Sequence, residues 1–156
     1  MTTSIAAKPT TSVKSAAAPT TTVKSATATT TTATKSGATA GALALATTSK
    51  GKVLVDSEGR TLYLYAKDTQ NKPSTCEATC ATTWPPEVAS GTAVAGTGLD
   101  TSKLSVLKRT DGTEQLAYNG WPLYRYAKDA KAGDDTGDGV GGTWFVVDAT
   151  GNAIKP

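Results

Sequence analysis

Two cysteines, Cys76 and Cys80, are the residues with the most definite chemistry in this chain. Three residues separate them, so on a helical turn both side chains lie on one face, within reach of a disulfide bond. A zinc or haem site would need more cysteines or a histidine, and the sequence has no histidine. A redox motif of the thioredoxin kind has two intervening residues rather than three. The pair therefore predicts a structural disulfide, which is the default for two cysteines outside the cytoplasm.

Acid–base catalysis has few residues to use. The chain has no histidine to act as a general base and no Gly-x-Ser-x-Gly motif for a nucleophilic serine. Asp68 and Asp129 could be imagined as a carboxylate pair of the glycosidase kind. Each follows a lysine at the end of an expected strand, where a bond to a tyrosine hydroxyl or the capping of a turn explains it better. We expect no enzyme, no catalytic residue and no cofactor.

An acidic, glycine-rich loop resembles the start of a calcium-binding loop. Asp134, Thr136 and Asp138 place oxygen atoms at its first, third and fifth positions, and Gly139 occupies the sixth. The twelfth position is Phe145, so the bidentate acid of an EF-hand is missing. The segment predicts a weak calcium site or, as the alternative, a polar loop without an ion.

A duplicated segment holds most of the other candidates. Residues 59–68 and 120–129 both contain the pattern Leu-Tyr-x-Tyr-Ala-Lys-Asp, and each residue of the first copy has its counterpart 61 positions later. Side chains alternate along a strand, so the two tyrosines of each copy share a face and the leucines point to the other. A duplicated strand–turn–strand unit predicts a domain with a pseudo-two-fold axis, in which each half covers the apolar face of the other.

Two interpretations of the tyrosines follow from this pattern. In the first, their rings pack at the edge of the core and their hydroxyls form hydrogen bonds at the rim. In the second, they form an exposed aromatic platform for a planar or sugar-like ligand. Trp121 is the best candidate for an exposed aromatic side chain, and packing across a hairpin is the alternative. The candidate binding residues are Tyr63, Tyr65, Tyr124, Tyr126, Trp121, Asp68 and Asp129.

Short strands and turns must position these residues. Asn119-Gly120 predicts a type I′ hairpin turn, because both central positions of that turn need a positive φ. Residues 53–55 and 60–66 are expected to pair as a hairpin around the turn at Gly59. Further strands are expected over residues 104–108, 114–118, 121–127 and 143–147, and a short helix over residues 75–83. The expected fold is therefore mostly β: a small, pseudo-two-fold, antiparallel domain of hairpin repeats with one short helix.

Residues 1–44 are expected to form a disordered linker ahead of this domain. The first 50 residues are mostly Thr, Ala, Ser and Lys, with no aromatic residue, and all 13 acids follow them. Such a stretch buries too little apolar surface to offset its chain entropy. The domain is then expected over residues 45–156, with repeats at about 51–90 and 112–156. The sparse lysines of the arm do not indicate nucleic-acid binding, and no stretch reaches the roughly 20 apolar residues of a membrane span.

The order of these motifs resembles a known family. Paired Tyr-x4-Asp motifs at 63–68 and 124–129, with Cys-x3-Cys at 76–80 and Trp-Pro-Pro at 84–86 between them, are similar to the secreted repeat family of bacterial lipoproteins. The resemblance implies an exported cell-envelope protein with two tandem repeats and no assigned reaction. No cysteine precedes residue 76, so a lipid-anchored form and a free secreted form are both expected alternatives.

The function expected from these features is that of an exported structural or binding module of the cell envelope, tethered by a flexible arm. Its expected partner is a cell-wall polymer or another envelope protein. The alternatives are weak carbohydrate binding through the tyrosine faces and Trp121, and a role in electron transfer or metal binding.

Overall fold

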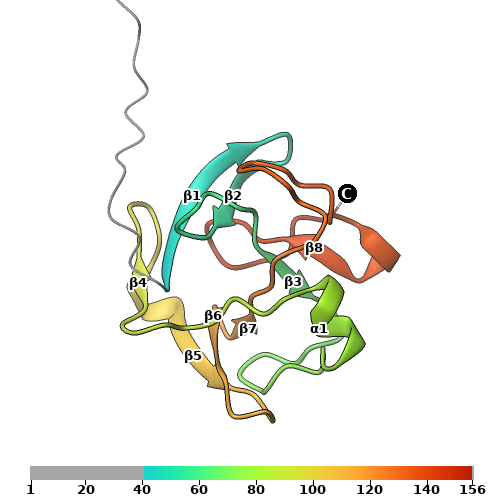
Figure 1. Cartoon of the computed structure of the whole chain (residues 1–156). Coiled ribbons are helices and arrows are strands. Elements are labelled where there is room, and N and C mark those ends of the chain that lie inside the picture. The colour runs from blue at the N-terminus through green and yellow to red at the C-terminus, as the bar shows by residue number, and fades with distance from the viewer. Residues whose placement is uncertain (1–40, 156) are drawn as a thin grey trace, which may run out of the picture. The chain divides into compact units, whose positions relative to one another are not determined.

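Short strands and long connecting turns form residues 41–155, the part of the chain that the computed structural model describes (Figure 1). Most of the predicted linker, residues 1–40, lies outside the described residues. In chain order the elements are β1 (Ala42–Thr48), β2 (Gly51–Val55), β3 (Tyr63–Tyr65), α1 (Thr79–Thr83), β4 (Val94–Ala95), a 3-10 helix (Thr101–Lys103), β5 (Leu104–Lys108), β6 (Glu114–Tyr118), β7 (Trp121–Pro122), a second 3-10 helix (Val140–Gly142) and β8 (Trp144–Val146). The prediction of a mostly β fold with one short α-helix is confirmed.

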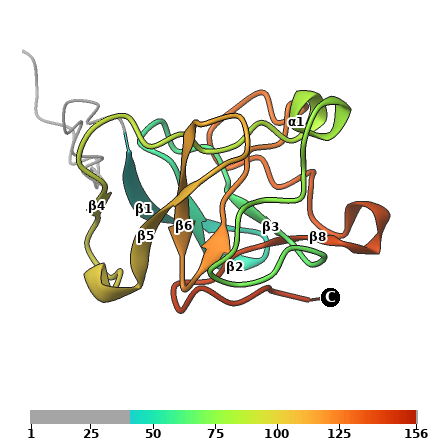
Figure 2. The same cartoon turned by 90° about the horizontal axis from the view of Figure 1, so that it is seen from below.

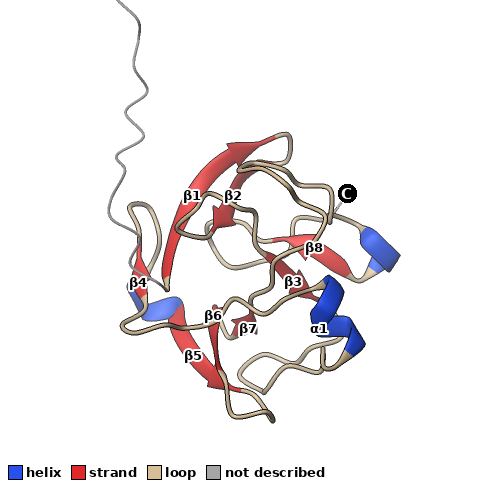
Figure 3. Cartoon of the chain, in the orientation of Figure 1, coloured by secondary structure: helices blue, strands red, loops and turns tan. Residues whose placement is uncertain are grey.

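The strands form three small sheets, with the orders β2-β1-β4, β3-β8 and β5-β6-β7 (Figure 3). All pairs are antiparallel except β1 with β4, which is parallel. The predicted strands at 104–108 and 114–118 agree with β5 and β6. The prediction missed β1, because its alternating Ala and Leu continue the small-residue composition of the preceding arm. The first described strand begins at Ala42, three residues before the predicted domain start at residue 45.

The Asn119-Gly120 turn has the predicted conformation. Both residues have positive φ, 52° and 77°, and Tyr118 pairs with Trp121 across the turn. The strand after the turn is shorter than the predicted 121–127, because the chain leaves β6 after Pro122 and Tyr124 pairs with Tyr63 instead.

The first hairpin differs more from its prediction. Residues 53–55 pair mainly with β1, and their contact with the following segment is limited to the Val55–Thr61 bridge and the bond from Leu62 N to Leu54 O. Beyond this point β3 pairs with β8 of the second repeat, as Figure 2 shows. Residues 60–66 therefore do not pair with β2 along their length as predicted, because the chain turns away after Leu62 and β3 pairs with β8.

The two repeats exchange their C-terminal segments around a pseudo-two-fold axis. At the axis, Tyr63 N donates to Tyr124 O at 2.8 Å and Tyr124 N donates to Tyr63 O at 2.9 Å. On either side, Ala66 N donates to Thr143 O and Ala127 N donates to Thr83 O. The segment that ends each repeat therefore lies against the tyrosine strand of the other repeat, which makes the two halves one cooperative unit.

The core divides into a leucine cluster and an aromatic cluster. Alternation along β3 sends Leu62 and Leu64 to the first cluster and Tyr63 to the second, and Leu123 and Tyr124 divide in the same way. The leucine cluster also contains Phe145 and Val147, and the aromatic cluster contains Trp84, Trp144 and Cys76. The predicted division of the repeat into a leucine face and a tyrosine face is confirmed.

Candidate functional site

The tyrosine and aspartate of each repeat motif bond to the opposite repeat. The Tyr63 hydroxyl donates to Asp129 Oδ2 at 2.5 Å, and the Tyr124 hydroxyl donates to Asp68 Oδ2 at 2.5 Å. We call these the crossed Tyr–Asp pairs. They explain why each motif needs both residues. The tyrosine of a motif donates to the aspartate of the other repeat, and the aspartate of that motif accepts from the tyrosine of the other repeat.

The second oxygen of each aspartate is used in the same way in both repeats. Asp68 Oδ1 accepts from the backbone N and the hydroxyl of Thr75, at 2.8 and 2.6 Å. Asp129 Oδ1 accepts from the backbone N and the hydroxyl of Thr136, at 3.2 and 2.5 Å. Each aspartate thus joins the tyrosine of one repeat to the loop that follows it in its own repeat. Every oxygen of the two carboxylates therefore accepts from a protein donor.

The environment keeps both tyrosine hydroxyls protonated. Burial, with a contribution from the bond to Asp129, raises the pKa of Tyr63 well above its ordinary value. Burial and the bond to Asp68 raise the pKa of Tyr124 in the same direction. Both hydroxyls therefore stay protonated at neutral pH and donate to the aspartates.

Four aromatic rings form a continuous stack across the pseudo-two-fold axis. Trp84 and Trp144 lie face to face at its centre, with ring centroids 3.9 Å apart and an angle of 4° between their planes. Tyr126 stacks on the outer face of Trp84 at 4.3 Å, and Tyr65 stacks on the outer face of Trp144 at 4.4 Å. We call Tyr65–Trp144–Trp84–Tyr126 the aromatic stack. It alternates between repeats, so it joins the two halves as the crossed pairs do.

The burial of these rings corrects the hypothesis of an exposed aromatic platform. Tyr63 and Tyr124 are wholly buried and Tyr126 is 9% exposed. Tyr65 is half-buried, with one face covered by Trp144. Trp121 is also half-buried and packs against the leucine cluster. The physical reason is the packing of the indoles: each one stacks on the second tyrosine of the other repeat and meets the first tyrosine of its own repeat edge-on.

The two cysteines form the predicted disulfide, which closes the turn leading into α1. Cys76 is wholly buried in the aromatic cluster and Cys80 is half-buried. Arg109 Nη2 donates to Cys76 O at 2.7 Å and Arg109 Nη1 donates to Gln115 Oε1 at 2.8 Å. This buried guanidinium fastens the disulfide segment to the hairpin of the second repeat.

Loss of the disulfide is expected to lower the free energy of unfolding by about 2 kcal/mol in an oxidising buffer, because the bridge restricts the unfolded chain. Cys80→Ser is the suitable variant, since a serine in place of the buried Cys76 would add the cost of an enclosed hydroxyl. Urea titrations of the variant and the parent protein measure the difference with and without a strong reductant. An equal loss of stability in both buffers would contradict a role for the bridge.

The acidic loop uses its oxygens within the protein. Asp134 Oδ2 accepts from the backbone N of Ala130 and of Lys131. The Thr136 hydroxyl donates to Asp129, and Asp138 pairs with Lys50 at 2.9 Å. Among residues 41–155, no group of three or more His, Cys, Asp or Glu residues could hold a metal ion. The three predicted calcium ligands are therefore all engaged in contacts within the protein.

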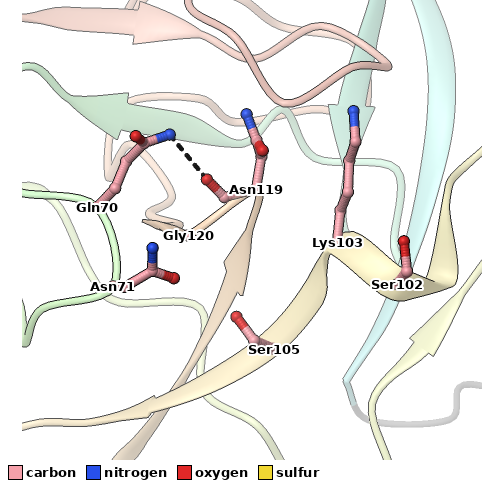
Figure 4. A pocket seen from close by; sticks show the side chains of 7 residues that line it. All are labelled: Gln70, Asn71, Ser102, Lys103, Ser105, Asn119 and Gly120. Atoms are coloured by element: carbon pink, nitrogen blue, oxygen red, sulfur yellow. Dashed lines mark hydrogen bonds between the residues drawn. The ribbon is translucent and has the colours of Figure 1, made fainter.

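An open pocket lies between the loop after Asp68 and the Asn119-Gly120 turn, with a volume of about 320 Å³ (Figure 4). Gln70 Nε2 donates to Asn119 O at 2.9 Å, and Asn71 N donates to Gly120 O at 2.7 Å. A glycine suits this turn, since Gly120 has a φ of 77° and a Cβ there would lie 2.7 Å from Asn71 Oδ1. We call it the polar pocket; its lining residues are Gln70, Asn71, Ser102, Lys103, Ser105, Asn119 and Gly120.

The polar pocket offers hydrogen-bonding groups and almost no charge. Its lining, all within the described part of the chain, consists of side-chain amides, hydroxyls, backbone and one ammonium group, without a carboxylate. Lys103 Nζ donates to Thr150 O at 2.9 Å. In Figure 4 the Asn71 amide and the Ser105 hydroxyl point toward the space between them. Such a surface suits a polyhydroxylated ligand, because amides and hydroxyls both donate and accept.

Sequence reasoning did not find this pocket. Only Asn119-Gly120 carries a local signal, and that signal is for a turn rather than for a site. Gln70 and Asn71 belong to the first repeat and Asn119 to the second. Ser102 and Lys103 come from the segment between the repeats. They meet only because Asn71 bonds to the turn of the other repeat, which is a tertiary contact without a sequence pattern.

A second pocket, with a volume of about 190 Å³, is charged. Glu87 Oε2 lies 3.1 Å from Arg125 Nε, and Asp56 Oδ2 lies 3.1 Å from Arg60 Nε. Glu58 also pairs with Arg60, and serine hydroxyls complete the lining. We call this the charged pocket. Burial, only partly offset by Arg125, raises the pKa of Glu87 to about 7, and the nearby Asp56 and Glu58 act in the same direction as burial.

The raised pKa makes stability depend on pH. A carboxyl group with a folded pKa near 7 and an unfolded pKa near 4.5 binds its proton more tightly in the folded state. Its contribution is therefore most favourable below about pH 4.5 and is lost as the pH rises through 7. We expect the parent protein to lose about 2 kcal/mol relative to Glu87→Gln between pH 5 and pH 8. Urea titrations at the two pH values test this, and parallel profiles for both proteins would contradict it.

Comparisons with known proteins agree with the duplicated architecture. A family model described as a secreted repeat of unknown function matches residues 44–87 and again residues 105–148. Both matches begin seven residues before the predicted repeats at 51 and 112, because each repeat opens with the first strand of its hairpin, β1 or β5. The curated proteins and the solved structures contain no match to the chain.

Within the described residues, no helix has the length and apolar character needed to cross a membrane. The two repeat matches together cover more than half of the 156 residues. They begin at equivalent residues of β1 and β5, so the repeat of the sequence is also the repeat of the fold. This protein therefore belongs to the family of secreted repeats of unknown function.

Proposed function

We propose that this protein is a non-catalytic binding module of the cell envelope that holds a polyhydroxylated cell-wall polymer in the polar pocket. The observation that carries the proposal is the lining of that pocket, which combines amides and hydroxyls from both repeats with one lysine. Wall polymers present hydroxyl and amide groups at short intervals, and such groups pair well with this lining.

The location of the pocket supports a binding role. It lies where the loop of the first repeat is fastened to the hairpin turn of the second, by the bonds of Gln70 and Asn71. Sites built on rigid elements hold their polar groups in fixed positions and so lose little entropy on binding. The disulfide, the family description and the open mouth of the pocket are all consistent with a long ligand outside the cytoplasm.

A sedimentation assay with insoluble peptidoglycan tests the proposal. We expect Gln70→Ala and Lys103→Gln each to weaken retention about tenfold, since each removes one or two hydrogen bonds to the polymer. Lys108→Gln is the matched control, because it removes the same charge from an exposed lysine at the far end of β5. Equal losses for Lys103→Gln and Lys108→Gln would mean that binding is only electrostatic. Retention that no polar-pocket variant changes would refute the site.

A further inference from the structure

Two buried atoms of the charged pocket, Glu87 Oε2 and Arg125 Nε, form an ion pair that lacks hydrogen-bond geometry. Glu87 is 9% exposed, and its Oε2 atom has no hydrogen-bond partner among residues 41–155 although Arg125 Nε lies 3.1 Å away. The Nε atom of Arg125 is likewise buried and without a hydrogen bond. Because these two atoms are buried, a ligand can reach only the other atoms of the two side chains. For Arg125, 30% of the side chain is accessible to solvent. Buried groups in this condition are uncommon and need an explanation.

The pseudo-two-fold axis shows that the fold does not need this charged pair. Leu64 takes the place of Arg125 in the first repeat, and it is 2% exposed in the leucine cluster. Val147 takes the place of Glu87: Leu116 N donates to Glu87 O, and Leu54 N donates to Val147 O at the equivalent point. The same backbone arrangement is thus filled by leucine and valine on one side and by an ion pair on the other.

Such a replacement is informative because a buried ion pair contributes little to stability compared with apolar residues of similar volume. The desolvation of both charges offsets most of their attraction. The first repeat demonstrates that apolar residues fit this place. A role outside folding therefore accounts for the pair, and its position on the wall of a pocket indicates which role.

We propose that the charged pocket is a binding site for a single neutral saccharide unit, held by Glu87 and Arg125. The pocket shares no residue with the polar pocket, so the proposal is independent of the function proposed above. Its volume of about 190 Å³ limits the occupant to one ring, since sites for larger molecules span about 300–1,000 Å³.

The chemistry of the walls selects a neutral donor–acceptor group. A carboxylate accepts a hydrogen bond and a guanidinium donates one, so a pair of adjacent hydroxyls satisfies both at once. A second ion pair, Asp56 with Arg60, also lines the pocket, and Ser57 and Ser90 add hydroxyls. A charged ligand would leave one member of each ion pair facing a like charge, whereas a neutral polyol leaves both pairs intact.

The pH dependence of binding follows from the state of Glu87. A ligand hydroxyl donates to the ionised carboxylate, so affinity is expected to rise with pH through the pKa of about 7. The groups facing Glu87 are Arg125, Arg60, Asp56 and Glu58. If only the ionised form binds, the apparent affinity increases about tenfold between pH 6 and pH 8.

The experiment is a titration of the full chain with N-acetylglucosamine, followed by nuclear magnetic resonance of the backbone amides and the Arg125 side chain. We expect shifts at Arg125 and Val88 with a Kd on the order of 1 mM at pH 8. The double variant Glu87→Val, Arg125→Leu copies the first repeat and is expected to keep or raise the melting temperature while losing these shifts. Gln70→Ala, in the polar pocket, is expected to bind the probe at this site as the parent protein does.

Three results would overturn the proposal. The first is an absence of shifts at about 100 mM probe, far above the expected Kd. The second is tighter binding of acetate at pH 6 than of the saccharide at pH 8, which would identify an anion site. The third is a melting temperature of the double variant well below that of the parent protein, which would show that the pair serves folding.

Discussion

Replacement of Asp68 by alanine is expected to lower the free energy of unfolding by about 3 kcal/mol. The carboxylate is 5% exposed and accepts from the Tyr124 hydroxyl and from the backbone N and hydroxyl of Thr75. Its removal leaves those donors without an acceptor, and the hydroxyl of the wholly buried Tyr124 keeps only its bond to Ser74. Chemical denaturation at neutral pH measures the loss.

Asp129→Ala is the matched comparison and is expected to cost about half as much. Asp129 makes the equivalent bonds to Tyr63 and Thr136, but it is half-exposed, so water replaces part of what is lost. The crossing itself is tested by double-mutant cycles. Tyr63→Phe should couple with Asp129→Ala by at least about 1 kcal/mol and add independently to Asp68→Ala. Coupling between Tyr63 and Asp68, which belong to one motif, would show that the bonds are not crossed.

The crossing marks the boundary of what could be predicted from the sequence. The repeat, the type I′ turn at Asn119-Gly120 and the strands at 104–108 and 114–118 depend on local patterns, and all of them are confirmed. The local pattern does not determine the partner of β3, which could be the closing strand of its own repeat or that of the other repeat. A tyrosine strand covered by its own repeat and one covered by the other repeat have identical periodicity, so only the packed structure distinguishes them.

The candidate sites show the same division. The disulfide between Cys76 and Cys80 follows from spacing and is present. The tyrosines were recognised as the important residues, yet the stacking of Tyr65 on Trp144 and of Tyr126 on Trp84 joins opposite repeats, which no local pattern indicates. Glu87 carries no sequence signal at all. Its environment becomes visible only when the structure aligns it with Val147, which lies at the same point of the other half.

The aromatic stack explains why each repeat carries a tryptophan. Trp84 and Trp144 are 4% and 5% exposed, and each has a tyrosine at right angles to its ring as well as its stacked neighbours. Gly137 completes the enclosure, because a Cβ at this position would lie 2.9 Å from both Trp84 and Tyr63. Packing against Trp84 and Tyr63 therefore explains the glycine at position 137 of the acidic loop, without reference to an ion.

Trp84→Ala is expected to have the largest effect of any single replacement, a loss of about 4 kcal/mol in the free energy of unfolding. The indole contacts Trp144, Tyr126 and Tyr63, and its removal opens a cavity at the centre of the stack. A domain of this size has a total stability of about 5–15 kcal/mol, so the alanine variant approaches the limit of folding. Trp84→Phe, with a smaller expected loss, keeps the measurement within the folded range.

A spectroscopic control separates the stack from general destabilisation. Two indoles with centroids 3.9 Å apart produce an exciton couplet in circular dichroism, and either Trp84→Phe or Trp144→Phe should abolish it in a folded protein. Trp121→Phe should leave the couplet unchanged, because Trp121 packs against the leucine cluster instead. Gly137→Ala should weaken the couplet and cost about 2 kcal/mol, because the added methyl group pushes against the Trp84 ring. A couplet that survives in both Trp84→Phe and Trp144→Phe would contradict the stack, since the pseudo-two-fold arrangement requires the two indoles to act together.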